Sequence, residues 1–169
     1  MSVYDIGDKM FYKCLNKSVN EAIEVIKKIS DNTKFQEYKF ELFYKVVIAV
    51  HFIADYEERV RLLIPKTDKD FTKGFLYLNN QLKHDYNLEM FYYEVCGSMF
   101  PMRFPMRFGK PGIYWDDFVD NGKKTSRGQR KHYEENLMNK DIEETLLKAL
   151  NIFSDINNSS NLTTKQVIQ

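Results

Sequence analysis

The chain has 169 residues, the size of one domain, and its 25 basic and 24 acidic side chains leave a net charge of +1. This balance excludes whole-molecule attraction to nucleic acid, so any such binding needs a local patch. The N-terminal ten residues lack the apolar core of a signal peptide, and the longest apolar stretch, residues 46–54, is too short to span a membrane. Cys14 and Cys96 form no CxxC pair, which favours reduced, buried thiols in a cytoplasmic protein.

Two helices are expected in the first third of the chain. Residues 1–16 form a leader, and a capping-box pattern, with Ser18 three positions before Glu21, predicts that the first helix begins at this serine. Apolar residues at three- and four-residue spacing predict a second helix from about Phe35 to Leu63. Residues 46–54 of this helix are apolar on nearly all sides, so it should be the central and most buried element.

A third helix should contain the stretch FTKGFLYLNNQLKHD, residues 71–85. Pro65 separates it from the helix before. Leucines supply its apolar side, and the polar residues Asn80, Gln81 and His84 lie three and four positions apart, so they share one helix face. This compact polar cluster makes the third helix the candidate location of a functional site.

A β excursion is predicted over residues 87–119. The aromatic run Leu88–Cys96 has the composition of a strand, and Ile113–Trp115 can return as a second, short strand. Between them, Phe100–Phe108 is a tandem repeat, FPMRFPMRF, whose two prolines favour extended backbone. In an extended chain its Phe and Met side chains share one face, while Pro and Arg share the other.

The last third of the chain is expected to be helical again. Residues 121–133 form a basic connector that contains no acidic residue, and a helix over about 130–138 is one reading of its end. A final helix fits Asp141–Ile156, and the polar residues 157–169 are predicted to be a disordered tail. The sequence therefore predicts a mainly α fold, a single domain over residues 1–156 built as a bundle of about four helices with an inserted β-hairpin or extended aromatic segment.

His84 is the first candidate for chemistry. A free imidazole titrates near pH 6.5, so it can accept or donate a proton at working pH. Asn79, Asn80 and Lys83 beside it can hold a phosphate or an amide group. The alternative is a structural histidine at a helix end, where the ring hydrogen-bonds a carbonyl or meets the negative end of the helix dipole.

The run LYLNNQLKHD, late in this helix, resembles the motif region of HEPN domains. The family pattern is an arginine, commonly an asparagine, three further residues and a histidine; here Asn79, Asn80 and His84 stand at these three positions. The resemblance implies an α-helical bundle, often dimeric, in which histidine and arginine from two subunits act on the RNA 2′-hydroxyl and the scissile phosphate without a metal. Loss of one strong transition-state donor costs about 3–4 kcal/mol, so the asparagine in place of arginine bears on catalysis more than on the fold.

A second match to the same spacing lies in the basic connector. Arg127 is followed by Gly128 and, after three further residues, by His132, which makes Arg127 and His132 an alternative catalytic pair. A pattern with two fixed residues arises easily in a basic segment. The other interpretation is therefore a solvated connector without chemistry.

A basic patch is the candidate RNA-binding surface, with aromatic side chains available for base stacking. The basic residues are Arg103, Arg107, Arg127, Arg130 and Lys131, and the aromatic ones are Tyr114, Trp115 and Tyr133. The alternative is that these charges form ion pairs with the acidic segment 134–144 that follows.

The sequence thus leaves two classes of function open. One is an RNA-directed, HEPN-like protein, either a metal-independent ribonuclease of a defence or toxin type or a catalytically degenerate relative. The other is a non-enzymatic helical module whose aromatic surfaces bind another protein. No His or Cys residues have metal-ligand spacing, so we expect neither a metal nor a cofactor, and we expect a cytoplasmic homodimer.

Overall fold

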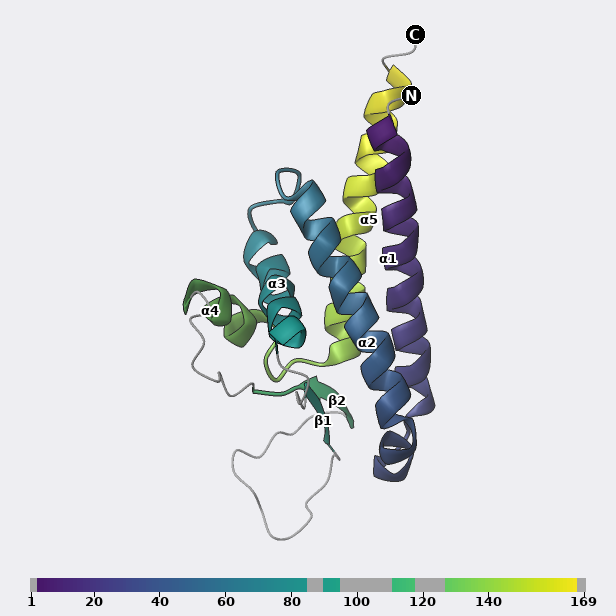
Figure 1. Ribbon diagram of the computed structural model, residues 1–169, viewed down its shortest axis with the longest axis vertical. Helices are drawn as coiled ribbons and strands as arrows, with labels where there is room; N and C mark the ends of the chain where they lie inside the picture. Colours follow the sequence, from purple (N-terminus) through teal and green to yellow (C-terminus); the bar gives the residue numbers. More distant parts are fainter. Residues whose placement is uncertain (1–2, 85–89, 95–110, 118–126, 167–169) are drawn as a thin grey trace.

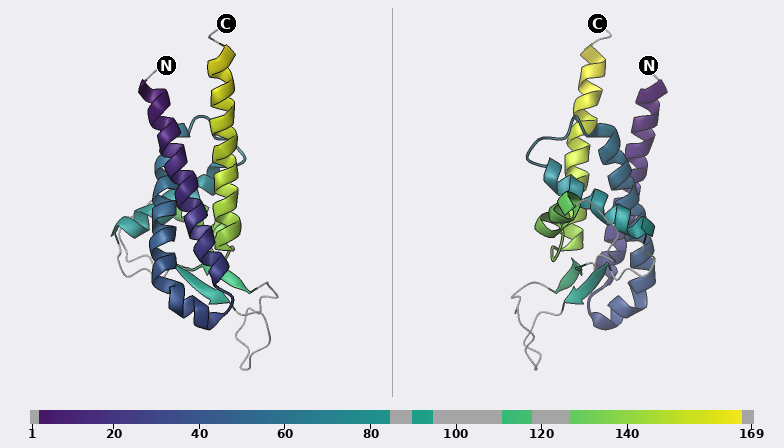
Figure 2. Two further views of the ribbon diagram at one scale, coloured as in Figure 1. Left: turned by 90° about the vertical axis from the view of Figure 1, so that its right-hand side faces the viewer. Right: turned by 60° about the vertical axis from the view of Figure 1, so that its left-hand side comes forward.

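Three long helices lie side by side along the long axis of the molecule, and two shorter helices and a two-stranded sheet pack to one side of them (Figures 1 and 2). In chain order the elements are α1 (Val3–Lys28), α2 (Asn32–Val60), α3 (Lys69–His84), β1 (Phe91–Glu94), β2 (Gly112–Trp115), α4 (Arg127–Asn136) and α5 (Ile142–Gln166). This computed structural model describes residues 3–84, 90–94, 111–117 and 127–166. The predicted fold class, a mainly helical bundle with an inserted hairpin, is confirmed.

The first helix, α1, is continuous through Ser18, so the predicted leader and the predicted helix start at this serine are wrong. The Ser18 hydroxyl donates to the backbone carbonyl of Leu15 at 2.9 Å instead of capping a new helix. Leu15 is fully buried, and Phe11 packs edge-on against Phe52 of α2 with 5.5 Å between ring centroids. One apolar face therefore continues through the supposed boundary. Cys14, expected to be buried, is exposed.

The second helix, α2, begins after Asp31, whose carboxylate caps it by accepting the Lys34 backbone N–H at 2.9 Å. Its inner face is buried as predicted. The fully buried side chains of this face are Leu42, Val46, Ala49, Val50 and Ile53. The helix ends at Val60, earlier than predicted, and Leu63 is 59% exposed in the connection to α3.

The third helix, α3, is buried on most of its circumference because α2 packs on one side of it and α4 on another. Gly74 lies where α3 and α4 cross. A Cβ at this position would lie 3.1 Å from the Leu137 side chain and 3.3 Å from the His132 carbonyl oxygen, so the missing side chain lets α4 come close. Residues 127–136, within the segment that the sequence left open, are helical.

The two strands pair antiparallel, with Phe91 opposite Trp115 and Tyr93 opposite Ile113. The first strand lies within the predicted run Leu88–Cys96, and the second begins at Gly112, one residue before the predicted strand Ile113–Trp115. The repeat at 100–108 lies outside the described residues. Trp115 is fully buried, and its indole N–H donates to the Thr145 hydroxyl at 2.8 Å. This bond ties the hairpin to the start of α5.

The last helix, α5, is capped by Asp141, whose carboxylate accepts the Glu144 backbone N–H at 3.0 Å. The helix continues to Gln166, so residues 157–166 are helical and the prediction of a disordered tail is wrong for them. No helix in the described part of the chain has the length and apolar character needed to cross a bilayer. The inner face of α5, with Leu146, Ala149 and Phe153, completes the core against α1 and α2.

Candidate functional site at the joined ends of α3 and α4

The polar cluster predicted from the sequence lies in the last two turns of α3. Asn79 is only 4% exposed, and its Oδ1 atom has no hydrogen-bond partner among the residues that the structure describes. Asn80 is half-buried and Lys83 is exposed. His84 is the last residue of the helix, and its side chain lies outside the described residues. The cluster therefore presents Asn80 and Lys83 toward the surface and Asn79 toward the interior.

Helices α3 and α4 pack antiparallel, so residues near the start of α3 contact residues near the end of α4. Near the start of α3, the Asp70 carbonyl accepts the Asn136 side-chain N–H at 3.5 Å, and near its end Asn80 donates to Gln129 Oε1 at 3.4 Å. Between them, the rings of Tyr77 and Tyr133 are 5.6 Å apart. The end of α3 and the beginning of α4 consequently lie at the same end of the pair, which brings position 127 to the side of the molecule that carries position 84.

Acidic side chains of α4 form ion pairs with its basic side chains and partly neutralise them. The Arg130 Nε atom donates to Glu134 at 2.6 Å, and this bond raises the pKa of the arginine above its ordinary value. Its second contact, to Asp117, is 3.5 Å long. Lys131 lies 3.6 Å from Glu135 and stays 69% exposed. The pairing with the following acidic segment, which the sequence left as the alternative, is thus present at both residues.

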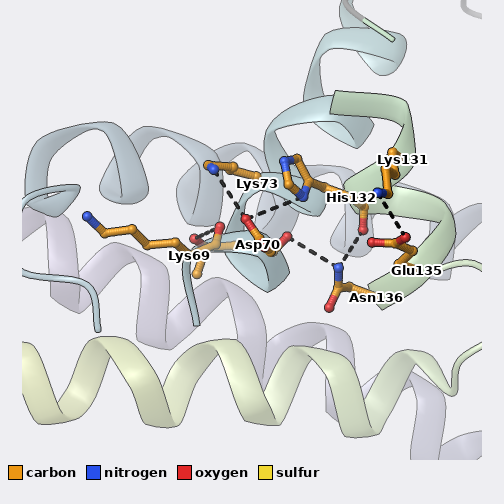
Figure 3. Close-up of polar contacts among 8 residues, drawn as sticks. Lys69, Asp70, Lys73, Lys131, His132, Glu135 and Asn136 are labelled. Atoms are coloured by element: carbon orange, nitrogen blue, oxygen red, sulfur yellow. Dashed lines mark hydrogen bonds and ion pairs between the residues drawn. The ribbon is translucent and has the colours of Figure 1, made fainter. Parts of the chain in front are cut away.

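His132, the histidine of the second motif match, belongs to a different cluster (Figure 3). Its Nδ1 atom lies 3.5 Å from the Asp70 carboxylate, which also accepts a hydrogen bond from Lys73 at 3.2 Å. Because Asp70 is in the first turn of α3, His132 lies near the opposite end of this helix from His84. Arg127 is the first residue of α4, and its side chain is outside the described residues.

Two of the three aromatic residues expected to stack on bases are not available for that role. Trp115 is fully buried and Tyr133 is 1% exposed, so neither ring can receive a base. Burial raises the pKa of the Tyr133 hydroxyl far above its usual range, and this hydroxyl donates to the Asp116 carbonyl at 2.6 Å. Tyr114 is half-buried and stacks on Tyr92. The prediction of a stacking platform from Trp115 and Tyr133 is wrong.

Sequence reasoning missed Asp70, Lys73 and Gln129, which connect the candidate residues. An acidic residue such as Asp70 is common in the first turn of a helix, where it interacts favourably with the helix dipole, so it gave no functional signal. The contact of Gln129 exists only because α4 packs against α3. Arg103 and Arg107 lie outside the described residues. Within the described ranges, no three His, Cys, Asp or Glu side chains gather closely enough to hold a metal ion. No family model matches the sequence, and no significant match exists among curated proteins or among solved structures.

Proposed function

We propose that the protein is RNA-directed and that its site is the end where α3 finishes and α4 begins. One observation supports this location most: the Asn80–Gln129 contact joins the helix that carries the histidine to the helix that begins with Arg127. The arginine that is missing at position 79 can thereby be replaced by positive charge from the neighbouring helix. A cation beside the scissile phosphate is what the transition state of RNA cleavage requires.

In the catalytic version, His84 removes the proton of the RNA 2′-hydroxyl. The oxygen so formed attacks phosphorus, the bond between phosphorus and the 5′-oxygen breaks, and the leaving oxygen takes a proton from water. The products are a 2′,3′-cyclic phosphate and a 5′-hydroxyl. Asn80 and Lys83 hold the phosphate, and Arg127 or Arg130 supplies charge to its non-bridging oxygens.

Asn79 has a supporting part in this proposal. At 4% exposure its amide cannot reach a phosphate at the surface unless the covering elements move. Asn80, one residue on, is half-buried and Lys83 is exposed, so these two side chains take the direct contacts. If catalysis has been lost with the arginine, the same surface still binds RNA through charge, which is the degenerate version of the function.

A cleavage assay tests the catalytic version. Labelled structured RNA is incubated in EDTA with the natural chain and with His84→Ala, which should slow cleavage by about 10²- to 10⁴-fold. His132→Gln is the matched control, because it removes the other histidine of the same motif spacing and should leave the rate within about twofold. Equal cleavage by His84→Ala, or loss in His132→Gln alone, contradicts this assignment.

A salt titration tests the RNA-binding version without requiring cleavage. Lys83→Ala and Arg130→Ala should each weaken RNA retention and reduce the slope of log affinity against log salt by about one. Lys13→Ala, an exposed lysine on α1, serves as the control with the same change of charge. Affinity that does not depend on salt, or equal loss in all three variants, would remove RNA from consideration.

The second candidate function, a protein-interaction module, is favoured by a separate observation. Phe40 is 83% exposed and Tyr44, one turn later on α2, is 55% exposed, so two aromatic rings share one solvent-facing stripe. A photoreactive phenylalanine analogue at position 40 should give a discrete crosslinked species in cells of the source organism, and one at Lys13 should not. Identical crosslinking at both positions counts against a specific interface.

A further inference from the structure

A groove lies between the α2–α3 connection, residues 61–68, and the middle of α5 (Figure 1). Its volume is about 350 Å³, and four apolar side chains line it: Leu63, Pro65, Ile152 and Ile156. The candidate RNA site is at the other end of α3, a helix of 16 residues and thus about 24 Å long. The groove therefore belongs to a different surface of the molecule from the proposed RNA site.

The same connection presents an apolar side chain to solvent beside the groove. Leu62 is 92% exposed, more than any other large apolar side chain among the described residues. Leu63, the next residue, and Pro65 line the groove, so an exposed leucine and an apolar hollow are neighbours on one surface. A two-fold dimer requires this combination, because the same patch on both copies must be complementary to itself.

Charges of both signs lie on this surface without an ion-pair partner. Asp68 and Asp155 line the groove, and Lys66 in the connection is exposed; none of the three forms an ion pair with another residue that the structure describes. Arg61 of the same connection, by contrast, pairs with Glu57 at 3.0 Å. When two copies are related by a two-fold axis, Lys66 of each copy can face a groove carboxylate of the other, so the charges are complementary in both directions.

We propose that this surface is a dimer interface in which Leu62 of each copy inserts into the groove of the other copy. There the leucine contacts Ile152 and Ile156, and Lys66 pairs with Asp155 across the interface. Both contacts form at once and the arrangement closes, so it gives a dimer and no longer polymer. The patch is small, so the dimer should dissociate when the protein is diluted.

Sedimentation equilibrium of the natural chain is the first test. Over about 2–200 µM the average mass should rise from that of the monomer toward twice that value. Leu62→Asp should weaken the dimer at least about tenfold, because it brings a third carboxylate into an apolar groove. Phe40→Asp, the same kind of change at a position on α2 that is 83% exposed, is the control and should dimerise normally. A natural chain that stays monomeric at the highest concentration, or equal loss in the control, overturns the proposal.

Charge exchange between copies is the second test. Lys66→Glu and Asp155→Lys each place like charges together at both symmetry-related contacts, so each variant alone should dimerise about tenfold more weakly. An equimolar mixture of the two variants restores opposite charges at both contacts and should dimerise within about threefold of the natural chain. Mixing cannot restore a pair within one chain, so this result requires contact between copies. Circular dichroism confirms that each variant is folded, and a mixture that fails to associate overturns the proposal.

This interface does not rest on the proposed function, and RNA retention by the same samples separates the two. A natural chain that dimerises in both tests but retains no RNA supports the interface and contradicts the RNA site. A natural chain that retains RNA but stays monomeric overturns the interface and leaves the RNA site supported.

Discussion

Asn79 places a polar group in the protein interior. Its Oδ1 atom is buried and finds no hydrogen-bond partner in the described part of the chain, and such a group carries an uncompensated desolvation cost of about 1–3 kcal/mol. We therefore expect Asn79→Leu, a change of similar volume, to raise the free energy of unfolding by about 1 kcal/mol. Urea denaturation followed by circular dichroism measures this. The half-buried Asn80, which bonds to Gln129, is the control, because Asn80→Leu should not stabilise the protein.

Because of Tyr133, the free energy of unfolding should decrease as the pH rises above about 10. Burial holds the pKa of its hydroxyl far above the value of about 10 that it has in the unfolded chain. Below pH 10 both states keep the proton. Above it only the unfolded state loses the proton, so the folded state becomes less stable by up to about 1.4 kcal/mol per pH unit.

Tyr133→Phe tests this at the same residue. The variant should lose about 1–2 kcal/mol at pH 7, because the Asp116 carbonyl loses its 2.6 Å hydrogen bond, and its stability should fall less steeply between pH 10 and pH 11. Urea denaturation at the three pH values gives both quantities. An unchanged slope would mean that the phenol titrates normally in the folded protein.

At the scale of elements, two glycines in neighbouring helices should respond oppositely to the same substitution. Gly74→Ala gains about 1 kcal/mol of helix propensity, but its Cβ meets the His132 carbonyl oxygen at 3.3 Å, and this backbone cannot move without displacing α4. We expect a net loss of about 1–2 kcal/mol. Gly128→Ala meets no atom of the described residues within 4 Å and should stabilise by about 0.5 kcal/mol. Thermal melts of both variants decide the matter, and stabilisation by Gly74→Ala would show that α4 adapts.

The sequence predicts elements that depend on local patterns, but it does not predict the packing of α4 against α3. The inner face of α2 and the cap of α5 depend on spacing and on one carboxylate, so local patterns identify them. The start of α1 was mistaken because Ser18 and Glu21 satisfy a local capping rule, while the apolar face that overrides it continues through Leu15. The approach of α4 to α3 depends on Gly74 and on distant contacts, and no local pattern contains that information.

The candidate site also has some features that the sequence could predict and others that depend on how the helices pack. The resemblance and the helical spacing identified Asn80, Lys83 and His84 as neighbours on one helix end, and the structure places them there. The burial of Asn79 could not be predicted, because it depends on what covers α3. Nor could the separation of His132 from His84, since it requires the opposite order of contacts along α3 and α4.

At the scale of the whole molecule, three long helices form a stem of α1, α2 and α5, and the hairpin with α3 and α4 forms a head beside it (Figures 1 and 2). Trp115 connects the two parts. Its backbone N–H donates to the Lys140 carbonyl at 3.1 Å, its indole reaches Thr145 of α5, and its ring packs against Phe75 of α3. Because these bonds are buried, we expect stem and head to unfold together.

Trp115 is the single tryptophan, so its fluorescence reports on the head while far-ultraviolet circular dichroism reports mainly on the long helices. The two signals should have coincident urea midpoints. Thr145→Val leaves the buried indole N–H without its acceptor and should lower the free energy of unfolding by about 1–3 kcal/mol, whereas Thr145→Ser keeps the hydroxyl and should cost less. Both signals should shift together in Thr145→Val. If fluorescence changes first, the head unfolds independently, and the bond between Trp115 and Thr145 does not couple it to the stem.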